Sequence, residues 1–153
     1  MVDQKLMTKV GLANLKKDLV KLENRRPGAV ERVEAARQMG DLRENSEYHA
    51  AREDLTLLDT QVDELKEILV NVKVVTGNNN GNNQIGLGNL VTVENNGQKI
   101  NYHLVGEHES DPVQKKISYT SPLGQALMNR KVNDKVIAKT PRGKIEYLII
   151  AIK

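Results

Sequence analysis

Two acidic residues, Asp41 and Glu44, form the part of this sequence best suited to metal chemistry. They lie three residues apart in the segment 40–48. Magnesium commonly binds proteins through one or two carboxylates and keeps water or phosphate oxygens as its other ligands. Two carboxylates alone do not complete a site, so a metal bound here would be shared with a partner. The same spacing also resembles a capping box, because acidic residues are favoured at the positive end of a helix.

A second group of possible metal ligands lies in the other half of the chain. It comprises His103, Glu107, His108 and Glu109. The spacing matches no compact zinc pattern, so we interpret this segment as a hydrophilic loop. The chain contains no cysteine, which excludes a disulfide framework and thiolate metal sites.

The acid pair is predicted to lie at the tip of a helical hairpin. On both sides of it, mostly apolar or small residues recur at steps of three and four, as in the seam of a coiled coil. The first series is Leu12, Leu15, Leu19, Leu22, Arg26, Ala29, Val33 and Ala36, and the second is Tyr48, Ala51, Leu55, Leu58, Val62, Leu65, Leu69 and Val72. When the chain folds back about residue 42, the two series pair one to one, from 12 with 72 to 36 with 48. The pattern predicts an antiparallel coiled coil about 36 Å long.

The seam has one irregular segment, Arg26-Pro27-Gly28. A proline inside a helix removes a backbone hydrogen bond, and here an arginine occupies a core position. We therefore expect a local bend or a short break. An ordinary helix pair inside a bundle is the alternative, but neither helix shows a second apolar face, which favours a protruding rod.

The chain divides into two predicted domains of different architecture. Residues 1–76 form the coiled coil, the Asn- and Gly-rich residues 77–84 form a linker, and residues 85–153 form a small sheet domain. Its predicted strands are 89–94, 99–105, 116–120, 135–140 and 144–152. A short helix begins at Ser121-Pro122 and runs to about Asn129, with serine as the N-cap. The fold class is therefore α+β.

Charge and composition limit the possible functions. The net charge of +3 does not by itself indicate a nucleic-acid-binding protein. Residues 1–76 hold 13 basic and 14 acidic residues, whereas 77–153 hold 10 and 6. The chain has no Phe or Trp, so it has few aromatic side chains that could stack on nucleic-acid bases. The N-terminus has no signal-peptide pattern, and the longest aliphatic run is too short to cross a bilayer, so we expect a cytoplasmic protein without a membrane partner.

Two segments resemble a known protein family. Residues 35–53 read AARQMGDLRENSEYHAARE, and residues 118–129 read SYTSPLGQALMN. Both are similar to signatures of the GreA/GreB transcript cleavage factors of bacteria, and Met7-Thr8 with Gly11 and Leu15 resembles the family's opening. The resemblance covers nearly the whole chain and is greater to GreA than to GreB.

The resemblance implies a function for the acid pair. In the family, the acids that match Asp41 and Glu44 enter the secondary channel of RNA polymerase and help to hold its second, weakly bound Mg²⁺. The polymerase's own active site then hydrolyses the 3′ end of a backtracked nascent RNA. A protein of this kind is a transcription elongation factor, not an enzyme on its own, and it has no cofactor besides the polymerase's Mg²⁺.

The resemblance also suggests roles for other tip residues. Arg37, Arg43 and Arg52 could guide the displaced RNA 3′ end by phosphate contacts. Their alternative role is that of solvated helix charges, with acidic partners nearby. Those partners would be Glu44, Glu47 and Glu53. Asn45 and Tyr48 are expected to shape the apex and its first seam layer.

The second half resembles the family's FKBP-like domain, which implies docking on the channel rim. We expect an apolar patch at Ser121, Pro122 and Leu123 to make this contact, although Ser121-Pro122 also suits a plain helix start. The implied partners are RNA polymerase and nascent RNA, with DNA reached only through the elongation complex. The protein is expected to act as a monomer.

Two other functions remain open at this point. A paralogue of the same fold could block the channel without stimulating cleavage, but such relatives carry a more acidic tip than this plain two-acid arrangement. A coiled-coil adaptor or chaperone would have no role in RNA chemistry. In the adaptor, replacing Asp41 and Glu44 by alanine would leave function intact.

Overall fold

The computed structural model describes residues 4–75 and 83–153. It forms two compact units, one comprising Ala13–Asn71 and the other Met1–Leu12 with Val72–Lys153. The predicted linker falls mostly on residues 77–82, which lie outside the described residues. The chain combines helices with a mixed sheet, as the sequence predicts for the α+β class.

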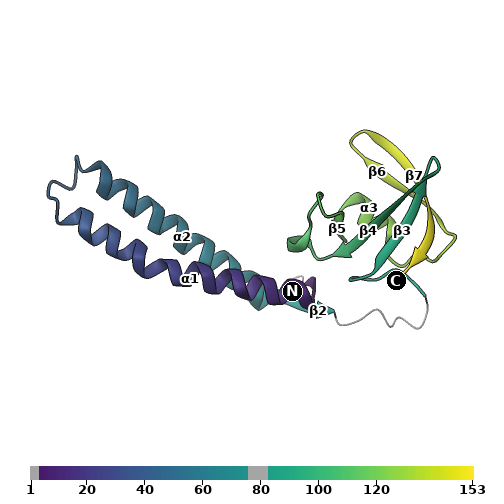
Figure 1. The fold of residues 1–153 in the computed structure, drawn as a ribbon, viewed down its shortest axis with the longest axis horizontal. Coiled ribbons are helices and arrows are strands. Elements are labelled where there is room, and N and C mark those ends of the chain that lie inside the picture. Colours follow the sequence, from purple (N-terminus) through teal and green to yellow (C-terminus); the bar gives the residue numbers. More distant parts are fainter. Residues whose placement is uncertain (1–3, 76–82) are drawn as a thin grey trace. The chain divides into compact units, whose positions relative to one another are not determined.

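The first unit is a two-helix hairpin (Figure 1). Helix α1 spans Lys9–Arg37 and helix α2 spans Ser46–Asn71. From Leu15 to Leu69 each predicted seam residue is buried or partly buried, with the single exception of Arg26. The antiparallel seam is therefore confirmed, because the heptad spacing keeps one stripe of each helix turned towards the other.

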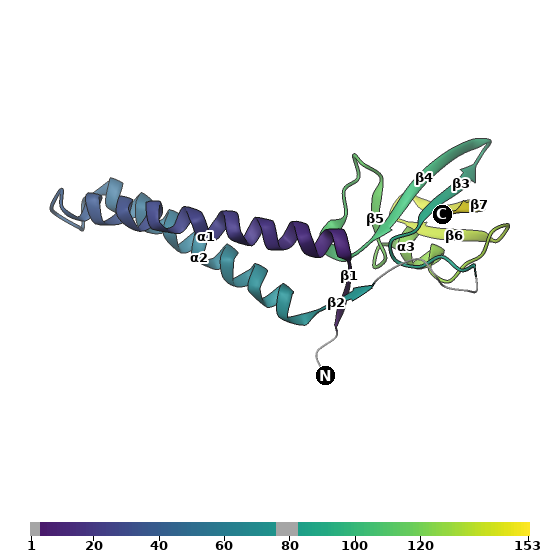
Figure 2. The same cartoon turned by 60° about the horizontal axis from the view of Figure 1, so that its bottom comes forward.

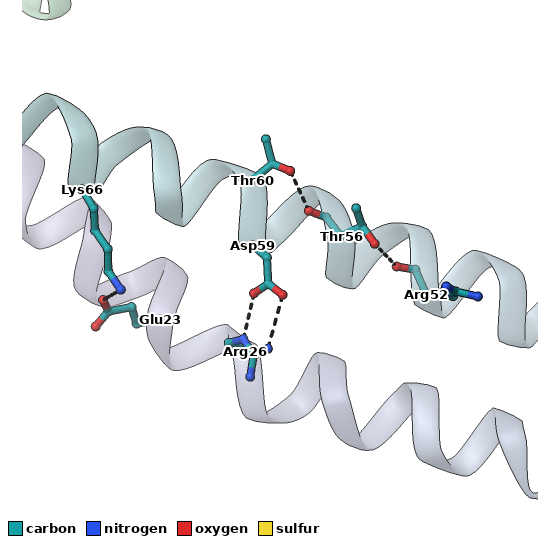
Figure 3. A network of polar contacts seen from close by, with 7 residues as sticks. All are labelled: Glu23, Arg26, Arg52, Thr56, Asp59, Thr60 and Lys66. Atoms are coloured by element: carbon teal, nitrogen blue, oxygen red, sulfur yellow. Dashed lines mark hydrogen bonds and ion pairs between the residues drawn. The ribbon is translucent and has the colours of Figure 1, made fainter.

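Near Pro27 the sequence predicts a local bend or a short break; the break is wrong, and the bend stays a prediction. Helix α1 continues through Pro27 without interruption, and Arg26 leaves the seam to bond with Asp59 on α2. Further ion pairs join the helices beside the seam, between Lys66 and Glu23 and between Arg32 and two acidic residues of α2. Figure 3 shows the Arg26 and Lys66 contacts. These ion pairs lie beside the seam and stabilise helix α1 around Pro27, where the proline removes a backbone hydrogen bond.

The outermost predicted seam pair, Leu12 with Val72, is also wrong. Helix α2 ends at Asn71, and Val72 begins strand β2, Val72–Val75. This strand pairs in parallel with β1, Lys5–Thr8 (Figure 2). In this register Val72 is opposite Lys5. Four-residue strands are too short to show a clear alternating pattern, which explains why the sequence did not reveal them.

The sheet of the second unit has the strand order β5-β4-β3-β7-β6. Only the β4–β5 pair is parallel. The strands are β3 (Leu90–Asn95), β4 (Gln98–Val105), β5 (Lys116–Ser118), β6 (Lys135–Thr140) and β7 (Gly143–Ile152). Each lies within two residues of a predicted strand. Helix α3, Pro122–Leu127, contributes the fully buried Leu127 to the core, where it joins Val91, Leu104 and Ile149.

The segment predicted to be a hydrophilic loop packs against β1. Its 3₁₀ turn η1, Glu107–Glu109, places the Glu109 carboxylate against Thr8, where it accepts hydrogen bonds from the backbone N–H and from the hydroxyl. Glu107 forms a 2.8 Å ion pair with Lys5, and the Tyr119 hydroxyl accepts the N–H of Leu6 at 3.0 Å. Glu107 and Glu109 therefore stabilise the packing of η1 against β1. The loop interpretation missed this role because the partners lie about a hundred residues away.

Candidate functional site at the hairpin apex

The apex is a short turn between α1 and α2. After Arg37 the chain leaves the helix through two tighter backbone bonds, from Met39 N–H to Ala36 O and from Gly40 N–H to Arg37 O. Gly40 has φ +89° and Asp41 has φ +33°. Glycine takes such left-handed angles without steric cost, and aspartate tolerates them better than most residues. The chain therefore reverses at Gly40 and Asp41, two residue types that tolerate left-handed backbone angles.

Asn45 organises the apex with both ends of its amide. Its Oδ1 accepts the N–H of Tyr48 at 3.0 Å, which makes Asn45 the N-cap of α2. Its Nδ2 donates to Ala36 O at 2.7 Å and to Gly40 O at 3.2 Å. Because Asn45 supplies the cap, the capping-box interpretation of the acid pair is wrong.

Tyr48 and Ala36 form the last buried layer beneath the apex. Their exposed fractions are 8% and 1%. His49 follows on the solvent side, where its ring meets that of Tyr48 edge-on at 5.6 Å between centroids. Its Nε2 lies 3.1 Å from the carbonyl oxygen of Arg43. The spacing of residues did not predict this contact, because it depends on the path of the turn.

The carboxylates of Asp41 and Glu44 are both exposed at the turn. Neither forms a hydrogen bond or an ion pair with any residue that the structure describes. Unpaired carboxylates of this kind suit Mg²⁺, a hard cation that prefers oxygen ligands and retains part of its water shell. Within the described ranges, no group of three or more acidic, His or Cys side chains could hold a metal ion alone. The donor set therefore fits a metal ion shared with a partner.

The three arginines near the tip differ in their surroundings. Arg37 lies 3.7 Å from Glu34 in an exposed pair on its own helix. The side chains of Arg43 and Arg52 are exposed and have no ion-pair partner among residues 4–75 and 83–153. Glu47, considered as a possible partner, instead pairs with Arg32 at 3.1 Å. Two cations near the apex are thus available for an external anion.

Comparisons with known proteins agree with the two halves of the chain. The family model described as "Transcription elongation factor, N-terminal" matches residues 5–74, and "Transcription elongation factor, GreA/GreB, C-term" matches residues 80–153. The chain belongs to the GreA/GreB family. Transcription elongation factor GreA of Legionella pneumophila is 38% identical over 151 residues, which are 96% of this chain and 94% of that protein.

Two further relatives extend this comparison. Transcription elongation factor GreA of Nitratiruptor sp. is 34% identical over 149 residues, covering 95% of this chain and 91% of the relative. The crystal structure of GreA factor homolog 1 of Thermus thermophilus is 27% identical and covers 98% of this chain and 99% of that chain, with a TM-score of 0.46. Members of the GreA/GreB family are bacterial transcription elongation factors that act with RNA polymerase.

In this GreA/GreB protein the predicted docking residues lie at the start of α3. The hydroxyl of Ser121 accepts the N–H of Gly124 at 3.0 Å and donates to Ser118 O at 2.6 Å. Leu123 is partly buried and packs against the sheet core. Pro122 is exposed. Ser121 and Leu123 thus have structural roles, and Pro122 is the member of the set that offers its side chain to solvent.

None of the helices in the described part of the chain is both long and apolar enough to cross a membrane.

Proposed function

We propose that this protein is a transcript cleavage factor. It enters the secondary channel of bacterial RNA polymerase with the hairpin apex first and stimulates hydrolysis of backtracked nascent RNA. The observation that carries the proposal is the pair of exposed, unpartnered carboxylates, Asp41 and Glu44, at the turn of a two-helix rod. Neither acid has a hydrogen-bond or ion-pair partner among residues 4–75 and 83–153, which supports a role toward a partner molecule.

The rod supplies the reach that this function needs. Helix α1 has 29 residues, which corresponds to a length of about 43 Å at 1.5 Å per residue. The seam and its flanking ion pairs hold the two helices together along this length. A paired rod delivers its apex to a deep site, whereas a single exposed helix would bend or fray.

The carboxylates would act as ligands within the polymerase active site. Asp41 and Glu44, together with ligands of the enzyme, would hold a Mg²⁺ ion there, which would supply Lewis-acid chemistry for phosphodiester hydrolysis by favouring hydroxide over water and by stabilising charge at phosphorus. The water oxygen would form the new P–O bond, the P–O3′ bond would break, and a proton from the water would end on O3′. The upstream RNA then regains the 3′ hydroxyl from which synthesis resumes.

Other residues of the chain would hold RNA and polymerase. Arg43 and Arg52 would contact phosphates of the extruded 3′ end. The C-terminal unit would dock on the channel rim near Pro122. We infer that the protein acts in the cytoplasm as a monomer, reaches DNA only as part of the elongation complex, and has no complete active site of its own.

The test uses a stalled, backtracked elongation complex with labelled RNA and Mg²⁺. Addition of the protein should release short 3′ fragments and allow synthesis to resume. Asp41→Ala with Glu44→Ala should bind the polymerase but release none. The matched control is Asp63→Ala with Glu67→Ala, which should behave as wild type. It removes two exposed acids from the C-terminal half of α2 that have no ion-pair partner in the described part of the chain.

Other outcomes would assign another function. If wild type blocks synthesis without releasing fragments, the protein is an inhibitor of the channel. If it neither binds the polymerase nor changes the RNA, the adaptor interpretation replaces the proposal.

A further inference from the structure

Each apex acid follows a residue whose carbonyl group is held by a side chain from the start of α2. Gly40 precedes Asp41, and its carbonyl oxygen accepts from Asn45 Nδ2 at 3.2 Å. Arg43 precedes Glu44, and its carbonyl oxygen lies 3.1 Å from His49 Nε2. The peptide group before each acid is therefore held by a different side chain, Asn45 for Asp41 and His49 for Glu44.

Asn45 and His49 both also contact residues of the last buried layer of the seam. Asn45 also bonds to Ala36 O at 2.7 Å and caps α2 through the N–H of Tyr48. The His49 ring lies against the ring of Tyr48, which is itself 8% exposed. The packed seam thus limits the motion of Asn45 and His49, and through them the motion of the turn.

The hydrogen bond to Arg43 requires a hydrogen on Nε2 of the His49 ring. A carbonyl oxygen can only accept, so Nε2 must carry the hydrogen that is donated to Arg43 O. The contact is therefore a directed hydrogen bond, and a ring without a donor at that position cannot form it.

We infer that Asn45 and His49 are positioning residues, which fix the separation and direction of Asp41 and Glu44 before a divalent cation is bound. This inference rests on the proposed function, since it concerns the same pair of carboxylates. Two exposed acids on a loose turn must lose conformational freedom when they bind one ion, and a turn that is already ordered loses less. Residues that orient metal ligands through hydrogen bonds act in the same way.

Three variants distinguish the effect of losing these hydrogen bonds from the effect of unfolding. His49→Phe keeps a ring against Tyr48 but cannot donate to Arg43. His49→Gln retains an N–H donor and should restore the contact. Asn45→Ser keeps an N-cap oxygen for Tyr48 but lacks the amide that bonds to Gly40. The control is His108→Phe, the same replacement at an exposed histidine of η1.

The first measurement is NMR relaxation of residues 41–44 in the isolated protein without metal. In wild type the backbone order parameters should be close to the rigid value of about 0.85, and in His49→Phe and Asn45→Ser they should fall below about 0.6. The Gln variant and the His108 control should retain the wild-type values. This measurement does not depend on catalysis or on polymerase.

The second measurement is the Mg²⁺ dependence of RNA cleavage in the backtracked complex. His49→Phe and Asn45→Ser should raise the half-saturating Mg²⁺ concentration by about tenfold, while the rate at saturating Mg²⁺ changes little. His49→Gln should recover most of the loss. A merely structural role would lower polymerase binding or the amount of folded protein and would not change this concentration alone.

The outcomes distinguish this inference from the proposed function. Wild-type order parameters in both loosening variants would overturn it, and so would a mobile turn with an unchanged Mg²⁺ dependence. An equal fall in rate at every Mg²⁺ concentration would also overturn it, because His49 or Asn45 would then contact the RNA directly. If wild type itself releases no fragments, the proposed function fails, and the positioning of a polymerase-bound cation fails with it even where the turn is rigid.

Discussion

Arg26 forms a two-pronged hydrogen bond with Asp59 across the hairpin, with Nε to Oδ1 at 2.7 Å and Nη2 to Oδ2 at 3.3 Å (Figure 3). The seam register places residue 26 opposite Leu58, which is 4% exposed. The side chain of Arg26 therefore lies outside the core, where Leu58 is buried, and bonds to Asp59, the residue next to Leu58. The hydrogen bond from Arg26 lowers the pKa of Asp59, and the same contact raises the pKa of Arg26.

The Arg26–Asp59 contact predicts an acid-dependent loss of stability in the hairpin. Since the pKa of Asp59 is lower in the folded than in the unfolded chain, the contribution is complete above the unfolded value and is lost as pH falls through the folded value. Wild type should therefore lose more stability than Asp59→Asn when the pH is lowered below about 4. Urea unfolding followed by helix circular dichroism at several pH values measures this difference.

The control for this comparison is Asp63→Asn, which removes an exposed acid that has no ion-pair partner among the residues that the structure describes. It should keep the wild-type pH dependence. Equal pH profiles for wild type and Asp59→Asn would contradict the prediction.

Replacing the irregular residues of α1 should stabilise the hairpin. Pro27 lies inside the helix, and restoring its N–H with alanine should raise the free energy of unfolding by up to about 3 kcal/mol. A Cβ at Gly28 meets no atom within 4 Å, so Gly28→Ala should add about 0.5–1 kcal/mol. Thermal and urea melts of the two variants measure the gain. A lower melting temperature in either variant would show that the helix needs the irregularity.

Gly124 should not tolerate a side chain, for a steric reason. A Cβ at this position would lie 1.9 Å from the backbone oxygen of Ser118. Gly124→Ala should therefore shift α3 and lower the free energy of unfolding by about 2–3 kcal/mol, measured by urea unfolding. Gly97→Ala is a useful comparison, because its Cβ meets nothing within 4 Å but its φ is +79°. That variant should lose about 1 kcal/mol through backbone strain, and an equal loss in both would contradict the steric explanation.

The unpaired arginines should determine the salt dependence of RNA engagement under the proposed function. Arg43→Ala and Arg52→Ala should each raise the half-saturating protein concentration for cleavage and lower the slope of its logarithm against log salt by about one, as for the loss of one phosphate contact. Titrations of the backtracked complex at several salt concentrations measure both quantities. Arg25→Ala, on the exposed surface of α1, is the control and should leave the slope unchanged. Unchanged slopes in the Arg43 and Arg52 variants would exclude phosphate contacts.

Much of the fold follows from local periodicity in the sequence. The steps of three and four residues predict the register of α1 on α2 and place the turn at residue 42, and the alternating segments predict every strand from β3 to β7 to within two residues. These patterns are readable because burial imposes a period of 3.6 on a helix and of 2 on a strand. The predicted seam failed at Arg26, which is exposed and bonds to Asp59. It also failed at its outer end, where Val72 pairs with Lys5 in a short parallel strand.

The sequence by itself determined that two acids lie at the turn of an antiparallel coiled coil, because heptad spacing on both sides defines the point of reversal. Only the tertiary structure decided how the turn is held. Asn45 reaches Ala36 and Gly40, and His49 reaches Arg43, through backbone carbonyl groups. The direction of a carbonyl depends on the path of the chain and leaves no mark on side-chain spacing. The bond between Glu109 and the N–H of Thr8 also appears only in the folded protein, because 101 residues separate the two partners.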